Sequence, residues 1–259
     1  MIETERTPQV ASFYDSLSDD YDLMTDFSAR LSSEEPVFRH LIAKYKIRTV
    51  LDAGAGTGLY SLILARLGVR VTVVDVSGAM LQQLARNAEM LGAHVETIKS
   101  SLENLSVAAP GTTDAIVCLG NTISHVQGDD DLRRVLANFS WILRPDGTLL
   151  IQLLNYEKIL HDAVRLQNIR ERNGTIFIRY YDLEPGFIRF NILKLSPRKG
   201  YSHQSVNLRP LVRADLLRLL PQEGFSQPDF FSDLSMQSFN PSESKDLVIV
   251  TKKTGEGQP

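Results

Sequence analysis

Two hydrophobic periods alternate along the first half of the chain, and this alternation restricts the possible folds more than any other feature. Short apolar runs of strand length recur, and stretches with apolar residues at helical spacing separate them. Strands without a polar face belong to a parallel sheet that is buried between helices. We therefore predict an α/β fold with strands at residues 49–53, 69–76, 95–99, 114–119 and 148–154.

The segment before the first strand departs from this alternation. Residues 8–24 and 32–46 both have helical spacing, with no strand between them. We expect residues 1–46 to form a helical cap and residues 47–259 to form the main domain.

A second departure follows the fifth strand and a helix expected near residues 156–168. Two strand-like runs, 175–183 and 187–195, flank the turn sequence Glu184-Pro185-Gly186, a pattern typical of an antiparallel hairpin. A third strand at 201–208 would extend this hairpin. An antiparallel insertion is therefore expected at 173–210, and the remaining elements are a helix at 213–220 and strands near 225–231 and at 246–251.

A glycine-rich turn, with Gly54, Gly56 and Gly58, connects the first strand to the next helix. Such a turn lets the backbone approach a ligand and leaves N–H groups free at the start of the helix. A dinucleotide site needs its third small residue one position later, where Leu59 stands. The carboxylate of Asp52 suits an ammonium group and would repel a pyrophosphate. The turn therefore favours a nucleotide that carries a methionine moiety.

The second strand ends at Asp75. A carboxylate in this position can accept hydrogen bonds from both hydroxyls of a ribose, whichever nucleotide is bound. The alternative is that Asp75 only caps the following helix.

Three segments resemble motifs of class I S-adenosylmethionine (SAM)-dependent methyltransferases. V-L-D-A-G-A-G-T-G at 50–58 is similar to their first motif, V-T-V-V-D-V-S-G-A-M-L at 71–81 to their second, and L-R-P-D-G-T-L-L-I at 143–151 to the segment entering the fifth strand. The resemblance implies a Rossmann-like, mostly parallel sheet of seven strands, with an N-terminal helical lid and the antiparallel insertion after the fifth strand.

The resemblance also implies the cofactor, SAM, and the residues that bind it. Asp52 would lie near the methionine amino group, Asp75 on the ribose and Met80 near the adenine. Many members carry an acid at the position of Ser101, so here the contact to the adenine would depend on the backbone of Leu102. The full expected set is Tyr14, Tyr21, Asp52, Ala53, Gly54, Gly56, Gly58, Asp75, Val76, Met80, Ser101, Leu102, Leu119 and Gly120.

The loop after the fourth strand holds the expected catalytic residues. C-L-G-N-T-I-S-H-V at 118–126 is similar to a stretch of glycine N-methyltransferases, which places Asn121 beside the substrate. His125 has the residue type and position of a general base in aminosugar N-methyltransferases. Because histidine also orients loops, His125 is expected to act either as the base or as a structural partner.

One residue departs from the glycine N-methyltransferase pattern. L-L-N-Y-E-K-I-L at 153–160 resembles the stretch after the fifth strand, in which those enzymes hold the substrate carboxylate with an arginine before the N-Y dipeptide. Leu154 occupies that position here and cannot pair with a carboxylate. The sequence therefore indicates a shared architecture with a different acceptor.

Aromatic and basic residues outside the central motifs are further candidates. The opening segment around Tyr14 and Tyr21 resembles the lid of many small-molecule methyltransferases, in which a tyrosine lies near the sulfonium. Tyr21 is our first candidate and an expected catalytic residue; packing in the core is the alternative for both tyrosines. In the insertion, Arg179 or Arg189 could bind an anionic or aromatic acceptor, unless they only form a solvated face.

Composition limits the possible partners and location. The net charge of −3 argues against a broad nucleic-acid-binding face, and no run approaches the roughly 18 apolar residues of a membrane span. The single cysteine, Cys118, lies in an apolar run and is expected to be a buried thiol. We predict a cytoplasmic enzyme with a small-molecule acceptor, no bound metal, and no nucleic-acid or membrane partner; the oligomeric state stays open.

The leading hypothesis is a methyltransferase that acts on the nitrogen or oxygen of a small molecule. Two alternatives keep the cofactor: a methyltransferase acting on RNA or protein, and a SAM-binding protein without catalysis. L-G-N-T at 119–122 stands where methyltransferases of nucleic-acid bases carry an N/D-P-P-Y motif, which argues against the first alternative.

Overall fold

The computed structural model describes residues 6–105, 110–197 and 200–255. A sheet of seven strands forms its centre, in the order β10-β11-β5-β4-β1-β2-β3. All neighbouring strands run parallel except β11, which is antiparallel to both β5 and β10. The strands are β1 (Thr49–Ala53), β2 (Arg70–Asp75), β3 (Glu96–Lys99), β4 (Thr113–Cys118), β5 (Leu143–Leu154), β10 (Asp229–Phe231) and β11 (Asp246–Lys252).

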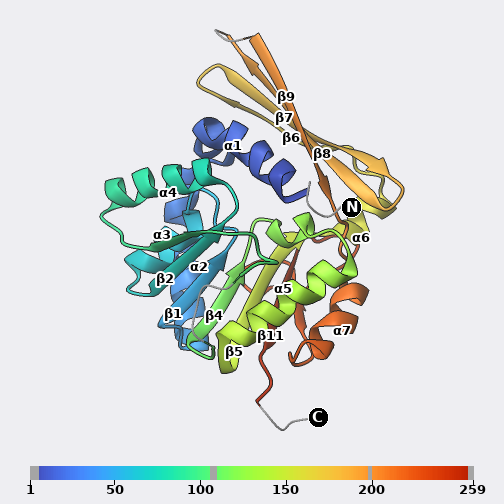
Figure 1. Ribbon diagram of the computed structural model, residues 1–259. Helices are drawn as coiled ribbons and strands as arrows, with labels where there is room; N and C mark the ends of the chain where they lie inside the picture. The colour runs from blue at the N-terminus through green and yellow to red at the C-terminus, as the bar shows by residue number, and fades with distance from the viewer. Residues whose placement is uncertain (1–5, 106–109, 198–199, 256–259) are drawn as a thin grey trace.

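Helices cover both faces of this sheet, so the predicted Rossmann-like α/β architecture is confirmed (Figure 1). The first hydrophobic cluster joins one face to side chains of α5 and α7, and the second joins the other face to side chains of α2 and α3. The helices are α1 (Arg6–Thr25), α2 (Phe27–Tyr45), α3 (Leu59–Arg66), α4 (Gly78–Leu91), α5 (Asp129–Ile142), α6 (Tyr156–His161) and α7 (Arg213–Gln222), with a short 3₁₀ helix at Thr122–His125.

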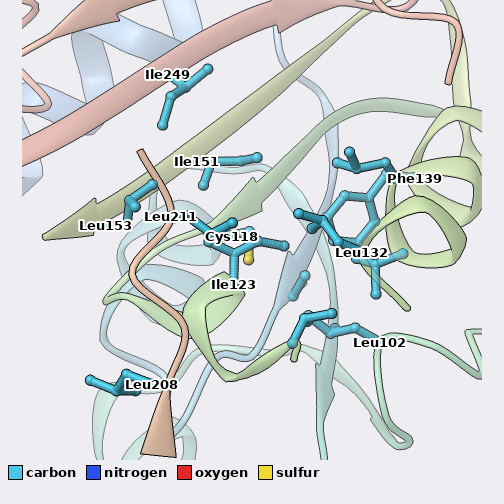
Figure 2. Close-up of a cluster of buried hydrophobic side chains, with 14 of the residues drawn as sticks. Leu102, Cys118, Ile123, Leu132, Phe139, Ile151, Leu153, Leu208, Leu211 and Ile249 are labelled. Carbon is cyan, nitrogen blue, oxygen red and sulfur yellow. The ribbon is translucent and has the colours of Figure 1, made fainter. Parts of the chain in front are cut away.

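The core reaches directly beneath the end of β4. Cys118 is fully buried there, among Leu132 and Phe139 of α5 and Ile151 of β5 (Figure 2). Burial raises the pKa of the Cys118 thiol, so the reactive thiolate is strongly disfavoured. The expectation of a buried structural cysteine is confirmed.

A second, antiparallel sheet of four strands follows α6, in the order β6-β7-β8-β9. Its strands are β6 (Leu166–Arg172), β7 (Thr175–Glu184), β8 (Phe187–Ser196) and β9 (Gly200–Leu208). The predicted hairpin and its third strand are confirmed. The helix expected up to residue 168 is wrong: α6 ends at His161, and β6 occupies the following stretch. Pairing of β6 with β7, which the local spacing does not reveal, overrides the helical pattern.

Helix α1 lies between α4 and the second sheet (Figure 1). Lys194 of β8 forms an ion pair with Asp20 of α1, and Arg172 of β6 pairs with Asp26, just after α1, at 2.6 Å. The two helices expected before the first strand are present. The second sheet holds α1 on one side, and α4 contacts it on the other.

No helix within the described ranges is long and apolar enough to cross a membrane.

Candidate functional site

The glycine-rich turn follows β1 and packs against the loop after β4. Gly54 has φ +80°, and a Cβ added there would lie 2.1 Å from Cγ2 of Thr122. A Cβ on Gly58, which has φ +91°, would lie 2.6 Å from Cγ of Leu84. Both positions therefore require glycine for the backbone conformation and for space.

Asp75 fixes the shape of this turn from the end of β2. Its Oδ2 accepts a hydrogen bond from the backbone N–H of Gly56 at 2.8 Å, and its Oδ1 accepts one from the N–H of Ser77 at 2.8 Å. Burial raises the pKa of its carboxyl, while these backbone hydrogen bonds act in the opposite direction. Asp75 also lines the cavity above the turn, where a ribose contact stays a prediction.

Asp52 lies behind the turn and does not line the cavity. Its Oδ2 accepts a hydrogen bond from Oγ of Ser61 at 2.5 Å, and its residue exposure is 1%. Burial raises the pKa of Asp52 to about 7. A contact with the ammonium group of a ligand therefore stays a prediction that would need approach through the turn.

A cavity of about 260 Å³ opens between the turn, α1 and the loops after β3 and β4. It lies at the carboxyl ends of the parallel strands, where α/β sheets bind ligands. The predicted site residues that line it are Tyr14, Tyr21, Gly54, Gly56, Asp75, Val76, Ser101, Leu102, Leu119, Gly120 and His125. Asp52, Ala53, Gly58, Met80 and Asn121 do not line it.

Tyr14 and His125 meet at one wall of this cavity. The Tyr14 hydroxyl lies 2.8 Å from Nε2 of His125, whereas Nδ1 of His125 is buried and has no partner in the described part of the chain. Burial lowers the pKa of His125 to about 4, so the imidazole is neutral near pH 7. One ring nitrogen is therefore held by Tyr14 and the other is unpaired.

Arg30 and Tyr60 line the same cavity and were missed in the sequence. Nη2 of Arg30 donates a hydrogen bond to the Tyr60 hydroxyl at 2.6 Å, and Nε of Arg30 lies 2.7 Å from Oε1 of Glu34. Tyr60 follows the glycine turn and could have been suspected from that position. Arg30 lies in α2, far from any motif, and no local signal marks it.

Comparison with known proteins assigns this architecture. Residues 50–147 match a family model described as "Methyltransferase domain". The chain carries a methyltransferase domain. The sequence-based assignment to the SAM-dependent methyltransferases, and with it the expected cofactor, is confirmed.

Relatives over most of the chain include glycine/sarcosine N-methyltransferases. One from Parasynechococcus marenigrum is 28% identical over 243 residues, which cover 92% of this chain and 84% of the relative. Among solved structures, a SAM-dependent methyltransferase from Clostridium acetobutylicum has a TM-score of 0.79 at 15% identity and covers 93% of this chain and 99% of its own. A sugar N-methyltransferase from Streptoalloteichus sp has a TM-score of 0.67 at 17% identity, with 91% and 93% covered.

Asn121 supports the loop after β4 without lining the cavity. Its Nδ2 donates to the Tyr156 hydroxyl at 2.9 Å, and its Oδ1 accepts from the backbone N–H of Leu154 at 3.1 Å. The residue has φ +73°, a conformation that asparagine tolerates better than most residues. A substrate contact by Asn121 stays a prediction, and the structure gives its side chain a loop-shaping role.

Met80 and Leu154 complete the set of predicted positions. Met80 is fully buried in the first turn of α4, and its backbone N–H donates to Oγ of Ser77 at 3.0 Å. Leu154 is half-buried at the end of β5, beside Asp246 of β11. Leucine at this position offers no charge to an acceptor carboxylate.

Two carboxylates fasten α1 over the methyltransferase cavity. Asp15 accepts hydrogen bonds from Oγ of Ser77 at 2.5 Å and from the backbone N–H of Ala79 at 3.2 Å, at the start of α4. Asp22 accepts from Nδ2 of Asn87 at 2.8 Å, further along α4. Each follows a cavity-lining tyrosine in the sequence, so these contacts set the positions of Tyr14 and Tyr21.

In the part of the chain that the structure describes, no group of three His, Cys, Asp or Glu side chains is placed to hold a metal ion.

Proposed function

We propose that the protein transfers the methyl group of SAM to the nitrogen of a small-molecule amine. The observation that carries this proposal is the cavity at the carboxyl ends of the strands, bounded by the glycine turn, Asp75 and the tyrosines of α1. The similarity to glycine/sarcosine N-methyltransferases over most of the chain supports nitrogen as the attacking atom.

The cofactor would lie across the glycine turn. Asp75 would accept the ribose hydroxyls, and the segment from Ser101 to Leu102 would flank the adenine. Arg30, which lines the cavity close to Tyr60, would attract the carboxylate of the methionine moiety. This orientation points the sulfonium toward Tyr21, whose ring lies 3.9 Å from the Cβ position of Gly56.

The chemistry would depend mainly on alignment. Bound SAM would supply a methyl group on a positively charged sulfur: the amine lone pair would attack the methyl carbon, the carbon–sulfur bonding electrons would return to sulfur, and S-adenosylhomocysteine would be the leaving group, a neutral thioether. Orienting the two reactants in this way can supply about 7–11 kcal/mol of the barrier. The amine must arrive neutral or lose its extra proton to solvent before attack.

His125 would orient this site and would be a poor general base. An efficient base has a pKa near the working pH, and burial lowers the pKa of His125 to about 4. The contact with Tyr14 instead holds the imidazole in the wall of the cavity.

Calorimetric titration with SAM, S-adenosylhomocysteine and NADH tests the cofactor. We expect both adenosyl compounds to bind and NADH to fail; tight NADH binding without a SAM response would falsify the proposal. Asp75→Ala should weaken SAM binding by more than tenfold if the ribose hydroxyls are bound there. Glu89→Ala, an exposed position on α4, is the control.

A screen of small amine, hydroxyl and phenol acceptors, followed as release of S-adenosylhomocysteine, tests the transfer. Turnover on amines supports the proposal. Turnover on hydroxyl compounds alone would assign oxygen instead, and SAM binding without turnover on any compound would indicate a non-catalytic SAM-binding protein. The composition-based expectations of a cytoplasmic location and of no nucleic-acid partner stay predictions.

A further inference from the structure

Strand pairing in the second sheet places the two candidate acceptor-binding arginines, Arg179 and Arg189, on opposite faces of the sheet. Arg179 of β7 pairs with the buried Ile192 of β8, on the face that carries the buried Phe177 and Tyr181. Arg189 of β8 pairs with Asp182 and is exposed on the opposite face. Only Arg179 therefore lies on the face that contributes to the main hydrophobic core beside α1.

The charge of Arg179 is not compensated by a carboxylate. Its one hydrogen bond runs from Nε to Oδ1 of the neutral Asn168, at 2.9 Å, and no acidic side chain of the described residues lies within ion-pair distance. Burial lowers the pKa of Arg179, and the like charge of Arg170 acts in the same direction. Removing a cation from water without a counter-charge is unfavourable, and a bound anion would relieve this cost.

Arg179 does not line the cavity, but it lies near the cavity-lining Tyr21, toward which the sulfonium would point. It is within electrostatic reach of Tyr21, which lines the cavity, and of Arg30. Arg30 is paired with Glu34, whereas Arg170 and Arg179 have no ion pair in the described part of the chain. Arg30 and Arg179 act on Tyr21 together with the carboxylates of Asp75 and Asp22. Within this group Arg179 is a cation without an ion pair in the described part of the chain.

We propose that Arg179 binds an anionic oxygen group of the methyl acceptor, such as a carboxylate, and holds the amine of that acceptor toward Tyr21. The forked donors of a guanidinium match the two oxygens of a carboxylate. Arg179 would supply, from the inserted sheet, the charge that Leu154 cannot supply from the end of β5. This inference rests on the proposed methyl transfer and adds the class of acceptor.

The test compares acceptors that differ only in this charge. Amino acids, their amides and the corresponding aminophosphonates would be assayed for S-adenosylhomocysteine release with the wild type, Arg179→Gln, Arg179→Lys and the outer-face control Arg189→Gln. We expect the acids to be preferred over the amides by the wild type, and KM for the acids to rise about tenfold or more in Arg179→Gln. The aminophosphonates show whether a carboxylate or a phosphonate-type group fits better.

A second measurement does not depend on turnover. With S-adenosylhomocysteine bound, the same amino acids should raise the melting temperature of the wild type and of Arg189→Gln, and should lose this effect in Arg179→Gln. The amides should act equally weakly on all variants. SAM affinity should stay within about twofold of the wild type in both variants, since Arg179 does not line the cofactor cavity.

Amides that bind and react as well as the acids, or an unchanged preference in Arg179→Gln, would overturn the role of Arg179 and leave the methyl transfer intact. Failure of the wild type to bind SAM would overturn both proposals. A preference for acids that is lost in Arg179→Gln and partly restored in Arg179→Lys supports the assignment.

Discussion

The hydroxyl of Tyr14 lies 2.8 Å from Nε2 of His125, although 111 positions separate the two residues in the sequence. The contact joins α1 to the loop after β4 across one wall of the cavity. It also determines the environment of a histidine that would otherwise be read as a general base. Both groups are neutral near pH 7, because burial raises the pKa of Tyr14 and lowers that of His125.

Removing the Tyr14 hydroxyl should destabilise the fold. Tyr14→Phe leaves a buried imidazole nitrogen without its partner, and we expect the free energy of unfolding to fall by about 1–3 kcal/mol. Urea unfolding measures this change. Tyr201→Phe, at a tyrosine with 77% exposure, should change stability by less than about 0.5 kcal/mol. An equal effect of the two substitutions would contradict a structural role for the Tyr14 contact.

The neutral state of the buried His125 should make the free energy of unfolding depend on pH in the acidic range. Its pKa is about 4 in the folded protein and 6.5 in the unfolded chain, so the unfolded chain takes up the proton first as the pH falls. The contribution of His125 is fully present above about pH 6.5 and is lost as the pH falls toward about 4. Unfolding titrations across this range should show a shallower loss for His125→Gln than for the wild type.

His161→Gln provides the matched control for this acid dependence. Its side chain is 86% exposed, so replacing it should leave the pH profile of the wild type in place. If His125→Gln and the wild type lose stability in parallel between about pH 6.5 and 4, then His125 is not buried in its neutral form.

The local features of the site could be predicted from the sequence because they depend on neighbours along the chain. Apolar runs located the strands of the central sheet, and glycine spacing located the turn that Gly54 and Gly58 make possible. The burial of Cys118 could likewise be predicted from the apolar residues next to it in the sequence. Each of these inferences needs only the physical chemistry of a few adjacent residues.

Contacts between distant segments could not be predicted in this way. Nothing near Arg30 in the sequence indicates its hydrogen bond to Tyr60. Likewise, nothing near Asn121 indicates that its side chain forms hydrogen bonds with Tyr156 and Leu154. The inward position of Arg179 depends on the register of three strands. These relationships arise from contacts between distant segments, which neither the hydrophobic periodicity nor the spacing of motif residues reveals.

The buried carboxyl of Asp52 should couple cofactor binding to pH. Its pKa is raised to about 7, so this group must ionise if the ammonium of SAM approaches it. SAM affinity should then increase as the pH rises toward about 7, with release of a proton, and Asp52→Asn should lose this dependence. Calorimetry in buffers of different ionisation enthalpy counts the protons. A flat profile in the wild type would give Asp52 only the structural contact with Ser61.

The close approach of Gly54 to Thr122 predicts a severe effect of one added methyl group. Gly54→Ala would place Cβ 2.1 Å from Cγ2 of Thr122, in a backbone conformation with φ +80°. Gly68→Ala has a similar φ of +85° but no atom within 4 Å, so it measures the backbone strain alone. We expect both variants to lose stability, and only Gly54→Ala to lose SAM binding. Comparable SAM affinity in the two variants would contradict the role of this contact in shaping the turn.

The attachment of α1 to α4 should control cofactor affinity from outside the cavity. Asp22 accepts hydrogen bonds from Nε2 of Gln83 at 3.1 Å and from Nδ2 of Asn87 at 2.8 Å, and it directly follows Tyr21. Asp22→Ala removes both hydrogen bonds and leaves Nε2 of Gln83 and Nδ2 of Asn87 with one acceptor each. We expect the free energy of unfolding to fall by about 1–3 kcal/mol. Because Tyr21 would lose its fixed position, SAM affinity should also fall, which calorimetric titration measures. Asp19→Ala, at an exposed position of the same helix, removes the same charge where the described residues form no hydrogen bond with it, and should change neither quantity. Equal SAM affinity in the two variants would show that the contacts of Asp22 with α4 do not control cofactor affinity.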